Sequence, residues 1–329
     1  YDIGLFLLRK LIFLLKRMKV VKDIKNYRSD KKSILTIGTF DGVHIGHQKI
    51  IKTLVAKAKE ENLYANVLTF FPHPRMILQK ESQIKLIDSL DEREQFLRNL
   101  GVDNLIIQPF SIAFSKLTAS EFIQDILVKK IEIASLYIGY DHHFGRNREA
   151  TVEDLKNYGV QFNFEVNVIS AQEIASISVS STKIREAITS GDFVKVKEFL
   201  GRPFQLIGKV IKGKEIGRTL EFPTANLQIE APYKIIPPQG VYIVSMTLNN
   251  KSHFGMMNIG TRPTLNGSQQ SIEIHIFNFN GDLYGKTITV CLIEKIREER
   301  KFNSLETLKK QLIIDKEICK RALTEKGFI

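Results

Sequence analysis

Ten residues near the start of the chain, Gly38–His47, constrain its fold more than any other segment. They follow a short apolar run, residues 33–37, and precede an amphipathic helical pattern over residues 45–61. Gly38 and Gly42 allow the backbone to approach a ligand closely, and the first turn of a helix presents unpaired N–H groups at the positive end of its dipole. The segment therefore predicts a strand, a turn and a helix N-terminus that binds phosphate.

Two histidines, His44 and His47, are three residues apart within this segment. On a helix this spacing places both imidazoles on one side of the first turn, where their ring N–H groups can reach the same phosphate. In the alternative interpretation both rings are only hydrogen-bonded within a loop. We favour the phosphate site because the two histidines coincide with two glycines and a helix start.

Length, charge and cysteine content limit the class of protein. The 329 residues suffice for two domains with separate cores, and the hydrophobic and charged fractions, 43% and 26%, are those of a globular chain. The net charge of +12 suits polyanions such as ATP, but the basic residues are scattered, so we expect no nucleic-acid partner. Cys291 and Cys319 form no Cys-x-x-Cys pair, which predicts no disulfide framework and a reducing, cytoplasmic location.

The first seventeen residues differ in composition from the rest of the chain. Two five-residue apolar blocks are separated and closed by basic pairs, and each block is too short to span a bilayer. A basic amphipathic helix lying on a membrane surface is the alternative. The first methionine is Met18, so we expect residues 1–17 to be an upstream or non-native segment and expect no membrane partner.

Strand-like and helix-like patterns alternate over residues 18–199. We expect strands near residues 34–37, 64–70, 104–108, 136–140 and 162–168, with helices between them near residues 45–61, 91–99, 118–130 and 151–158. This alternation predicts βαβ units and a parallel sheet, an α/β domain of the Rossmann-like kind. Ligands of such sheets bind at the carboxyl ends of the strands, where Gly38–His47 lies.

From residue 200 the pattern changes to short alternating runs. These runs cover residues 204–212, 241–249, 253–259, 271–279 and 286–293, and Asn-Asn or Asn-Gly turn signals lie between several of them. They predict an antiparallel β-barrel, followed by a C-terminal helix over residues 305–323 with Ser304 as its N-cap. The sequence thus predicts two domains, residues 18–199 and 200–329.

Three further segments of the first domain lie near expected strand ends. Phe70–Pro74 combines two aromatic rings with two prolines that fix the loop, and could cover a planar ring. Gly139–Gly145 contains Asp141, an acceptor suited to a polyol. Its Asp-His-His run does not favour a metal site, because consecutive strand residues point to opposite sides. Ser180–Arg185 places three hydroxyls and two cations at a helix start, which is a second phosphate site or a plain N-cap.

Together these segments resemble a known family. The sequence of residues 38–47 contains the His-x-Gly-His signature of nucleotidyltransferases. In full it reads Gly-Thr-Phe-Asp-Gly-Val-His-Ile-Gly-His. With the other three segments in the same order, it is similar to bacterial bifunctional riboflavin kinase/FAD synthetases. The resemblance implies that His44, His47 and Arg185 stabilise adenylyl transfer from ATP to FMN, a reaction that needs positioning and charge stabilisation more than a base. It also implies ATP contacts from Gly38, Thr39, Phe40, Asp41, Ser181 and Thr182, and flavin contacts from Phe70, Pro72, Pro74 and Asp141.

The second half has its own motif, Gly217–Asn226. Its proline fixes a turn and leaves Thr224 and Asn226 as neighbouring oxygen ligands for Mg²⁺ beside substrate phosphates, although a polar hairpin turn is the alternative. In the strand-like run 271–277 the polar residues share one face. Glu273, on that face, is the best candidate for a general base, the alternative being a solvent-facing strand.

The Pro-Thr-Ala-Asn wording of this motif resembles the signature of riboflavin kinases. The resemblance implies ATP contacts from Gly217 and Arg218, Mg²⁺ at Thr224 and Asn226, and Glu273 as the base that deprotonates the riboflavin 5′-hydroxyl. Glu221 stands where the family usually has glycine, which puts a carboxylate near the expected triphosphate.

Both motif sets occur in the order that the bifunctional family uses, across residues 19–325. The resemblance implies an enzyme that phosphorylates riboflavin to FMN and adenylylates FMN to FAD with release of pyrophosphate, using ATP and Mg²⁺. Two alternatives remain at this point: a nucleotidyltransferase for another phosphorylated metabolite, and a flavin-binding regulator without catalysis.

Overall fold

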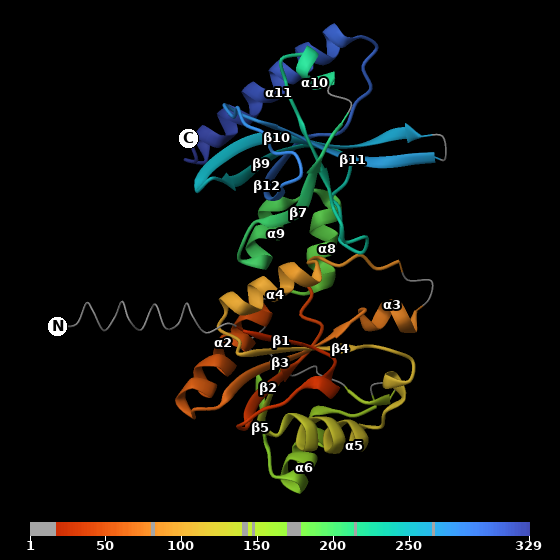
Figure 1. Ribbon diagram of the computed structural model, residues 1–329, viewed down its shortest axis with the longest axis vertical. Helices are drawn as coiled ribbons and strands as arrows, with labels where there is room; N and C mark the ends of the chain where they lie inside the picture. The colour runs from red at the N-terminus through yellow and green to blue at the C-terminus, as the bar shows by residue number, and fades with distance from the viewer. Residues whose placement is uncertain are drawn as a thin grey trace, which may run out of the picture. The chain divides into compact units, whose positions relative to one another are not determined.

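The computed structural model describes residues 18–79, 83–139, 144–146, 149–169, 179–213, 216–264 and 267–329. Residues 1–17 and Asp141, about which the sequence makes predictions, lie outside the described residues. The chain divides into two compact units, Tyr1–Val179 and Ser180–Ile329, which we call the first and the second unit (Figure 1). None of the helices in the described ranges is long and apolar enough to cross a membrane.

The first unit is built on a six-stranded parallel sheet in the order β1-β4-β3-β2-β5-β6. Its strands are β1 (Lys19–Lys22), β2 (Ser33–Ile37), β3 (Tyr64–Phe71), β4 (Asn104–Pro109), β5 (Ile133–Gly139) and β6 (Glu165–Ile169). Its helices are η1 (Ile24–Asn26), α2 (Ile45–Glu60), α3 (Pro74–Leu78), α4 (Leu90–Asn99), η2 (Phe114–Lys116), α5 (Ala119–Glu121), the π-helix η3 (Phe122–Ile131) and α6 (Val152–Phe162). The predicted α/β parallel sheet is confirmed.

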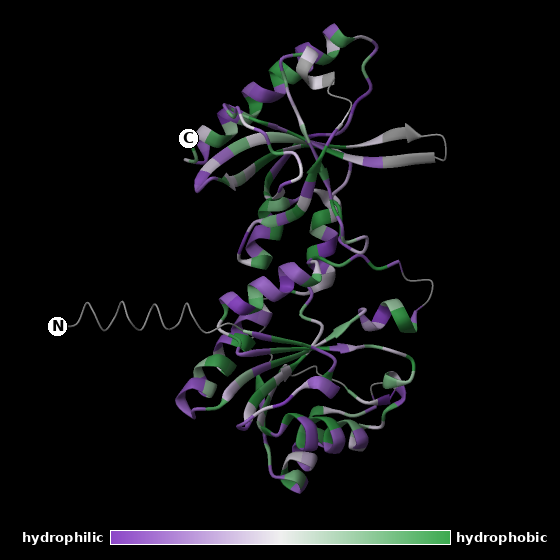
Figure 2. Cartoon of the chain, in the orientation of Figure 1, coloured by the Kyte–Doolittle hydropathy of each residue, from purple (hydrophilic) through white to green (hydrophobic). Residues whose placement is uncertain are grey.

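Both faces of this sheet are covered, so its central strands are apolar on successive residues (Figure 2). Every residue of β2 is buried. In β3, Leu68 packs in a cluster with η3, whereas its neighbour Val67 faces the opposite side and packs with residues of α2 and α4. The strand order reverses at β2, which has β3 on one side and β5 on the other. This topological switch point makes the carboxyl end of β2 the expected ligand site.

The second unit is a closed barrel of six strands in the order β10-β11-β8-β7-β12-β9, with neighbouring strands antiparallel. The strands are β7 (Phe204–Ile211), β8 (Ala225–Gln228), β9 (Gly240–Leu248), β10 (Lys251–Thr264), β11 (Gly267–Ile276) and β12 (Thr287–Arg297). The helices are α8 (Ser181–Ser190), α9 (Phe193–Leu200), α10 (Ile216–Thr219) and α11 (Leu305–Glu325). The predicted barrel and C-terminal helix are confirmed, and Ser304 is the N-cap of α11.

Helix α11 supports the barrel and the motif beside it. Leu220 and Phe222 of the Gly217–Asn226 segment are buried in one cluster with Cys319 of α11. Helix α9 also packs on the barrel, where the ring of its Phe193 lies 6.0 Å from that of Phe204 and 5.6 Å from that of Tyr242, centroid to centroid. Both α8 and α9 thus fall in the second unit, and the domain boundary at 199/200 stays a prediction.

Candidate active sites

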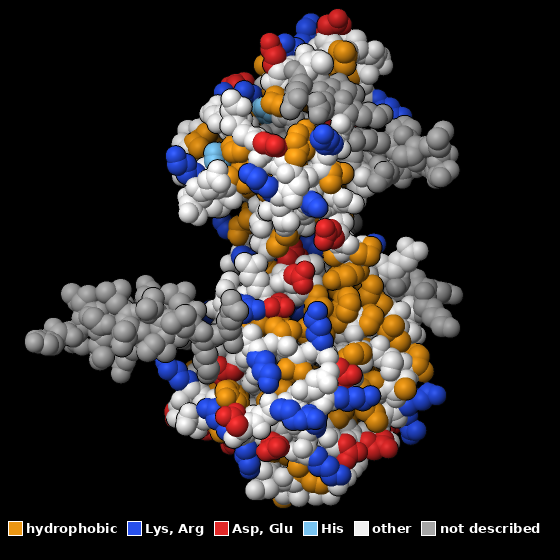
Figure 3. All heavy atoms as spheres, viewed as in Figure 1, with side chains coloured by type: hydrophobic (Ala, Val, Ile, Leu, Met, Phe, Trp, Pro, Cys, Tyr) orange, Lys and Arg blue, Asp and Glu red, His pale blue; other side chains and the backbone are white. Residues whose placement is uncertain are grey.

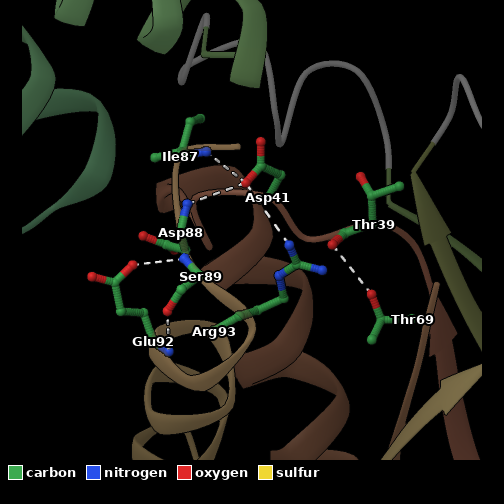
Figure 4. A network of polar contacts seen from close by, with 8 residues as sticks. All are labelled: Thr39, Asp41, Thr69, Ile87, Asp88, Ser89, Glu92 and Arg93. Atoms are coloured by element: carbon green, nitrogen blue, oxygen red, sulfur yellow. Dashed lines mark hydrogen bonds and ion pairs between the residues drawn. The ribbon is translucent and has the colours of Figure 1, made fainter. Parts of the chain in front are cut away.

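The loop after β2 is tied to β3 and holds an unusual backbone conformation. The Gly38 N–H donates to the Leu68 carbonyl at 3.1 Å, and the Thr69 hydroxyl donates to the Thr39 carbonyl at 3.2 Å (Figure 4). Phe40, Gly42 and Val43 have φ angles of 47°, 89° and 37°. Glycine adopts this region freely, but for phenylalanine and valine it is strained, so the loop must be held by its surroundings.

The contacts of Asp41 restrain the loop after β2 in this conformation. Its side chain is fully buried, and its Oδ1 atom accepts hydrogen bonds from the backbone N–H groups of Ile87 at 2.9 Å and Asp88 at 3.3 Å. The same oxygen lies 3.9 Å from Nη2 of Arg93 (Figure 4). Asp41 therefore joins the loop to the segment that leads into α4. The ATP contacts expected from Gly38, Thr39, Phe40 and Asp41 stay predictions.

The two histidines lie at the start of α2 as a stacked pair, with ring centroids 3.6 Å apart and planes inclined by 18°. His44 is the N-cap of α2, and its Nδ1 accepts the His47 backbone N–H at 3.3 Å. Because Nδ1 accepts, the ring proton of neutral His44 sits on Nε2, which is then a donor. His44 and His47 hereafter are called the histidine pair.

Burial favours the neutral form of both members of the pair. Burial lowers the pKa of His44 from 6.5 to about 4. Burial also lowers the pKa of His47 well below its usual value, and the neighbouring His44 and Arg93 lower it further. The Phe40 ring packs edge-on against His47 at 5.1 Å between centroids. Neutral imidazoles at a helix N-terminus can donate hydrogen bonds to phosphate oxygens without carrying an extra charge.

Gly46, the glycine of the His-x-Gly-His signature, is required for steric reasons. A Cβ atom added to Gly46 would lie 3.3 Å from both Cε1 and Nδ1 of His44, which is tighter than ordinary van der Waals contact. A side chain here would press on the ring that caps α2. Gly46 therefore leaves room for the histidine pair to stack.

Aromatic side chains gather at the carboxyl ends of β3 and β4. Half-buried Phe70 lies 5.7 Å from both Phe110 and Phe114, centroid to centroid, and hydrophobic side chains are grouped on the visible face of the first unit (Figure 3). Pro72 follows Phe71 through a cis peptide bond, and Pro74 opens α3 behind His73, its N-cap. This apolar surface suits a planar ring, although the flavin contacts of Phe70, Pro72, Pro74 and Asp141 stay predictions.

The Ser180–Arg185 segment forms the start of α8. The Ser180 hydroxyl accepts the Lys183 N–H at 3.2 Å, which confirms the N-cap alternative for this residue. Ser181 and Arg185 are half-buried and Thr182 is exposed. Because α8 belongs to the second unit, the expected roles of Ser181, Thr182 and Arg185 in ATP binding stay predictions.

The barrel brings three oxygen-bearing side chains together. Asn226 of β8 is the register partner of Glu273 on β11, and the Thr224 hydroxyl donates to Oε2 of Glu273 at 3.3 Å. A hydroxyl, an amide and a carboxylate are hard oxygen donors of the kind that Mg²⁺ accepts beside phosphates, so these residues fit such an ion. Asn226 lies on the short strand β8, and the Mg²⁺ ligation expected from Thr224 and Asn226 stays a prediction.

A pocket of about 610 Å³ adjoins these residues. Its wall contains Thr224 and Ala225, Ile274 of β11, and the loop from Phe279 to Tyr284. Apolar and aromatic side chains with a few polar groups at one end are typical of small-molecule sites. A ligand in this pocket would therefore lie beside Thr224 and its hydrogen bond to Glu273.

Gly217 and Glu221 shape the turn before β8. A Cβ atom on Gly217 would collide with the Phe222 carbonyl, so only glycine fits there; the side chain of Arg218 is outside the described residues. Glu221 has a φ angle of 68°, which explains the glycine that the family usually has at this position. Its exposed carboxylate pairs with Lys309 of α11 at 2.8 Å, and this hydrogen bond and charge lower the pKa of Glu221.

Comparisons with known proteins match both halves of the chain. A family model described as FAD synthetase matches residues 26–183, and one described as riboflavin kinase matches residues 200–323. The bifunctional riboflavin kinase/FMN adenylyltransferase of Escherichia coli (strain K12) is 36% identical over 301 residues, 91% of this chain and 96% of that protein. Its counterpart from Buchnera aphidicola subsp. Schizaphis graminum (strain Sg) is 36% identical over 310 residues, 92% of this chain and 98% of that protein.

A solved structure is similar to this chain in fold over most of its length. The crystal structure of a protein named macrolide-efflux protein, from Streptococcus pneumoniae, has a TM-score of 0.83 and 32% identity, and the match covers 92% of this chain and 99% of that one. The two family models together cover most of the chain, and the curated relatives match nearly end to end. The chain therefore belongs to the family of bifunctional riboflavin kinase/FMN adenylyltransferases.

Proposed function

We propose that this chain phosphorylates riboflavin to FMN at the barrel site and adenylylates FMN to FAD at the histidine pair, with ATP as co-substrate of both reactions. The observation that carries the proposal is the presence of two separate sites, one in each unit, each built around the motif of one activity. The family to which the chain belongs supports the same pair of activities.

In the adenylyl transfer, an FMN phosphate oxygen attacks the α-phosphorus of ATP, and the bond to the pyrophosphate leaving group breaks. The nucleophile is already ionised, so no base is required. The residues of the chain supply fixed donors: Nε2–H of His44, a ring N–H of His47 and the N-terminal amides of α2. These donors stabilise the negative charge that develops on the phosphoryl oxygens. The aromatic surface around Phe70 holds the flavin ring in this proposal, which the clustering of Phe70, Phe110 and Phe114 supports.

In the kinase reaction, the riboflavin 5′-hydroxyl attacks the γ-phosphorus of ATP and ADP leaves. Glu273 takes the hydroxyl proton as general base. Its carboxylate is oriented by the hydrogen bond from Thr224, and the pocket beside Thr224 offers room for the nucleotide. Mg²⁺, held by Thr224 and Asn226, would neutralise charge on the phosphates.

The free thiols of Cys291 and Cys319 suit a reducing, cytoplasmic location.

The decisive experiment incubates purified protein with riboflavin, ATP and Mg²⁺ and separates the flavins by chromatography over time. We expect FMN to appear first and FAD to follow. FMN without FAD would contradict the adenylyltransferase half of the proposal, and neither product would contradict both halves.

A further inference from the structure

Arg93 is a buried cation beside Asp41 of the loop after β2. It lies on α4, its side chain is only 1% exposed, and it is among the largest fully buried side chains of the chain. Its charge partner is Asp41, with Nη2 3.9 Å from Oδ1. Within the described ranges, its Nε and Nη2 atoms have no hydrogen-bond partner.

A buried guanidinium with unpaired N–H groups lowers the stability of the fold, so its presence calls for a reason other than stability. A buried ion pair rarely stabilises a fold more than apolar residues of the same size would, and buried N–H groups of this kind are normally hydrogen-bonded. A purely structural role would be met as well by a methionine or leucine packed beneath the loop. The retained charge therefore indicates a requirement of the adjacent site.

Two neighbours of Arg93 belong to that site. Through Asp41 it is joined to the loop in which Phe40 and Val43 are held at left-handed φ angles. Asp41 also binds the Ile87 and Asp88 amides, and Ser89 then caps α4, one turn before Arg93 (Figure 4). The loop and the start of α4 are thus fastened to each other through one carboxylate and one guanidinium.

The second neighbour is His47. The positive charge of Arg93 lowers the pKa of His47, in addition to the effects of burial and of His44. The groups that face His47 are thus His44 at the start of α2, Phe40 of the loop and Arg93 of α4, with Asp41 balancing Arg93. A cation beside His47 makes protonation of this residue more costly and adds a fixed positive field at a site for polyphosphate.

We propose that Arg93 is a positioning residue of the adenylyltransferase site, which fixes the loop through Asp41 and places a positive charge beside His47. This inference rests on the proposed adenylyl transfer for its consequence on rate. The protonation of His47 can be measured without any turnover, so failure of the inference and failure of the proposed function give different results.

Three variants of the full chain separate charge from packing. Arg93→Lys keeps the positive charge, and Arg93→Met removes it at similar volume. The double variant Asp41→Asn with Arg93→Met removes both charges, and the asparagine oxygen can still accept from the Ile87 and Asp88 amides. Because a lone buried carboxylate is destabilising, we expect the double variant to unfold at a higher temperature than Arg93→Met alone, which makes it the informative folded variant.

The readouts are the imidazole resonances of His47 in an NMR pH titration, and the rates of FAD formation from FMN and of FMN formation from riboflavin. In Arg93→Met we expect the His47 titration midpoint to rise, because the positive charge is gone while Asp41 remains. In Arg93→Met and in the double variant we expect FAD formation to fall at least about tenfold with riboflavin phosphorylation unchanged. Arg93→Lys should keep the parent midpoint. If the double variant folds and retains the parent rate of FAD formation, or if Arg93→Met leaves the His47 midpoint unchanged, Arg93 is only structural and the inference is wrong. An altered midpoint with no FAD formation by the parent protein would contradict the proposed function instead.

Discussion

The protonation state of His44 is the property on which the proposed adenylyl transfer most depends. His44 is 7% exposed and its Nδ1 is engaged by the His47 N–H. Its pKa is lowered from 6.5 to about 4, a difference of about 2.5 pH units. At about 1.4 kcal/mol for each unit, protonating this ring in the folded protein costs about 3.5 kcal/mol more than in the unfolded chain.

The sign of the pH dependence follows from that difference. Because the folded-state pKa lies below the unfolded value, the unfolded chain binds the proton first as the pH falls through 6.5. The contribution of His44 to stability is complete above pH 6.5 and is lost as the pH falls toward 4. By pH 4.5 the first unit should have lost about 2.6 kcal/mol of its unfolding free energy through this one group.

The matched variant is His44→Asn. Asparagine is a good N-cap residue, so it retains the hydrogen bond to the His47 N–H but does not titrate. We expect an NMR titration of the parent to contain one imidazole with a midpoint of about 4 that disappears in His44→Asn. Urea unfolding of the first unit at pH 6.5 and 4.5 should show a loss about 2.2 kcal/mol larger in the parent than in the variant. A His44 midpoint between 6 and 6.5, or equal losses in the two proteins, would refute the view that the ring is buried and caps α2.

Three other substitutions test separate parts of the structure. Glu273→Gln should lower riboflavin phosphorylation by about a hundredfold or more while FAD formation from supplied FMN continues; loss of both activities would argue against two independent sites. Gly46→Ala should press on His44 through a Cβ only 3.3 Å from its ring and lower FAD formation by about a hundredfold, and an unchanged rate would show that the stacked pair is not needed. Asp315→Asn removes the carboxylate that binds Nε and Nη2 of Arg297 at 2.9 and 2.6 Å. Since Asp315 is fully buried, calorimetry should show the second unit destabilised by about 3 to 5 kcal/mol, whereas a change below about 1 kcal/mol would contradict this anchoring of α11.

Much of the fold could be predicted because its signals are local. The fully apolar run 33–37 is what a strand buried on both faces requires, and the structure contains β2 there. The glycine-bearing loop and the spacing of the histidine pair predicted a helix start, which is the N-cap of α2. In the second unit, alternation and turn residues predicted five of the barrel strands. These features depend on residues a few positions apart.

The features that sequence reasoning missed depend on distant parts of the chain. Strand β8 has four residues, too few for a clear alternation, and is defined by pairing with β11 some fifty positions later. Arg93 looked like an ordinary charged residue of an amphipathic helix, which is normally solvated. Its spacing relative to Leu97 and Leu100 places it on the apolar side of α4, and this was the signal that could have identified a buried charge.

The two sites differ in the charges that they present, and the difference follows from the two nucleophiles. A hydroxyl must lose its proton to attack phosphorus, so a carboxylate such as Glu273 beside Thr224 is useful in the barrel. A phosphate is already anionic, and a carboxylate facing it would repel both it and ATP. The motif of the first unit nevertheless contains an aspartate, Asp41. Its side chain is buried in the protein, where two backbone amides and Arg93 balance its charge. Under the proposed function, the histidine pair then supplies the neutral donors that face the substrate.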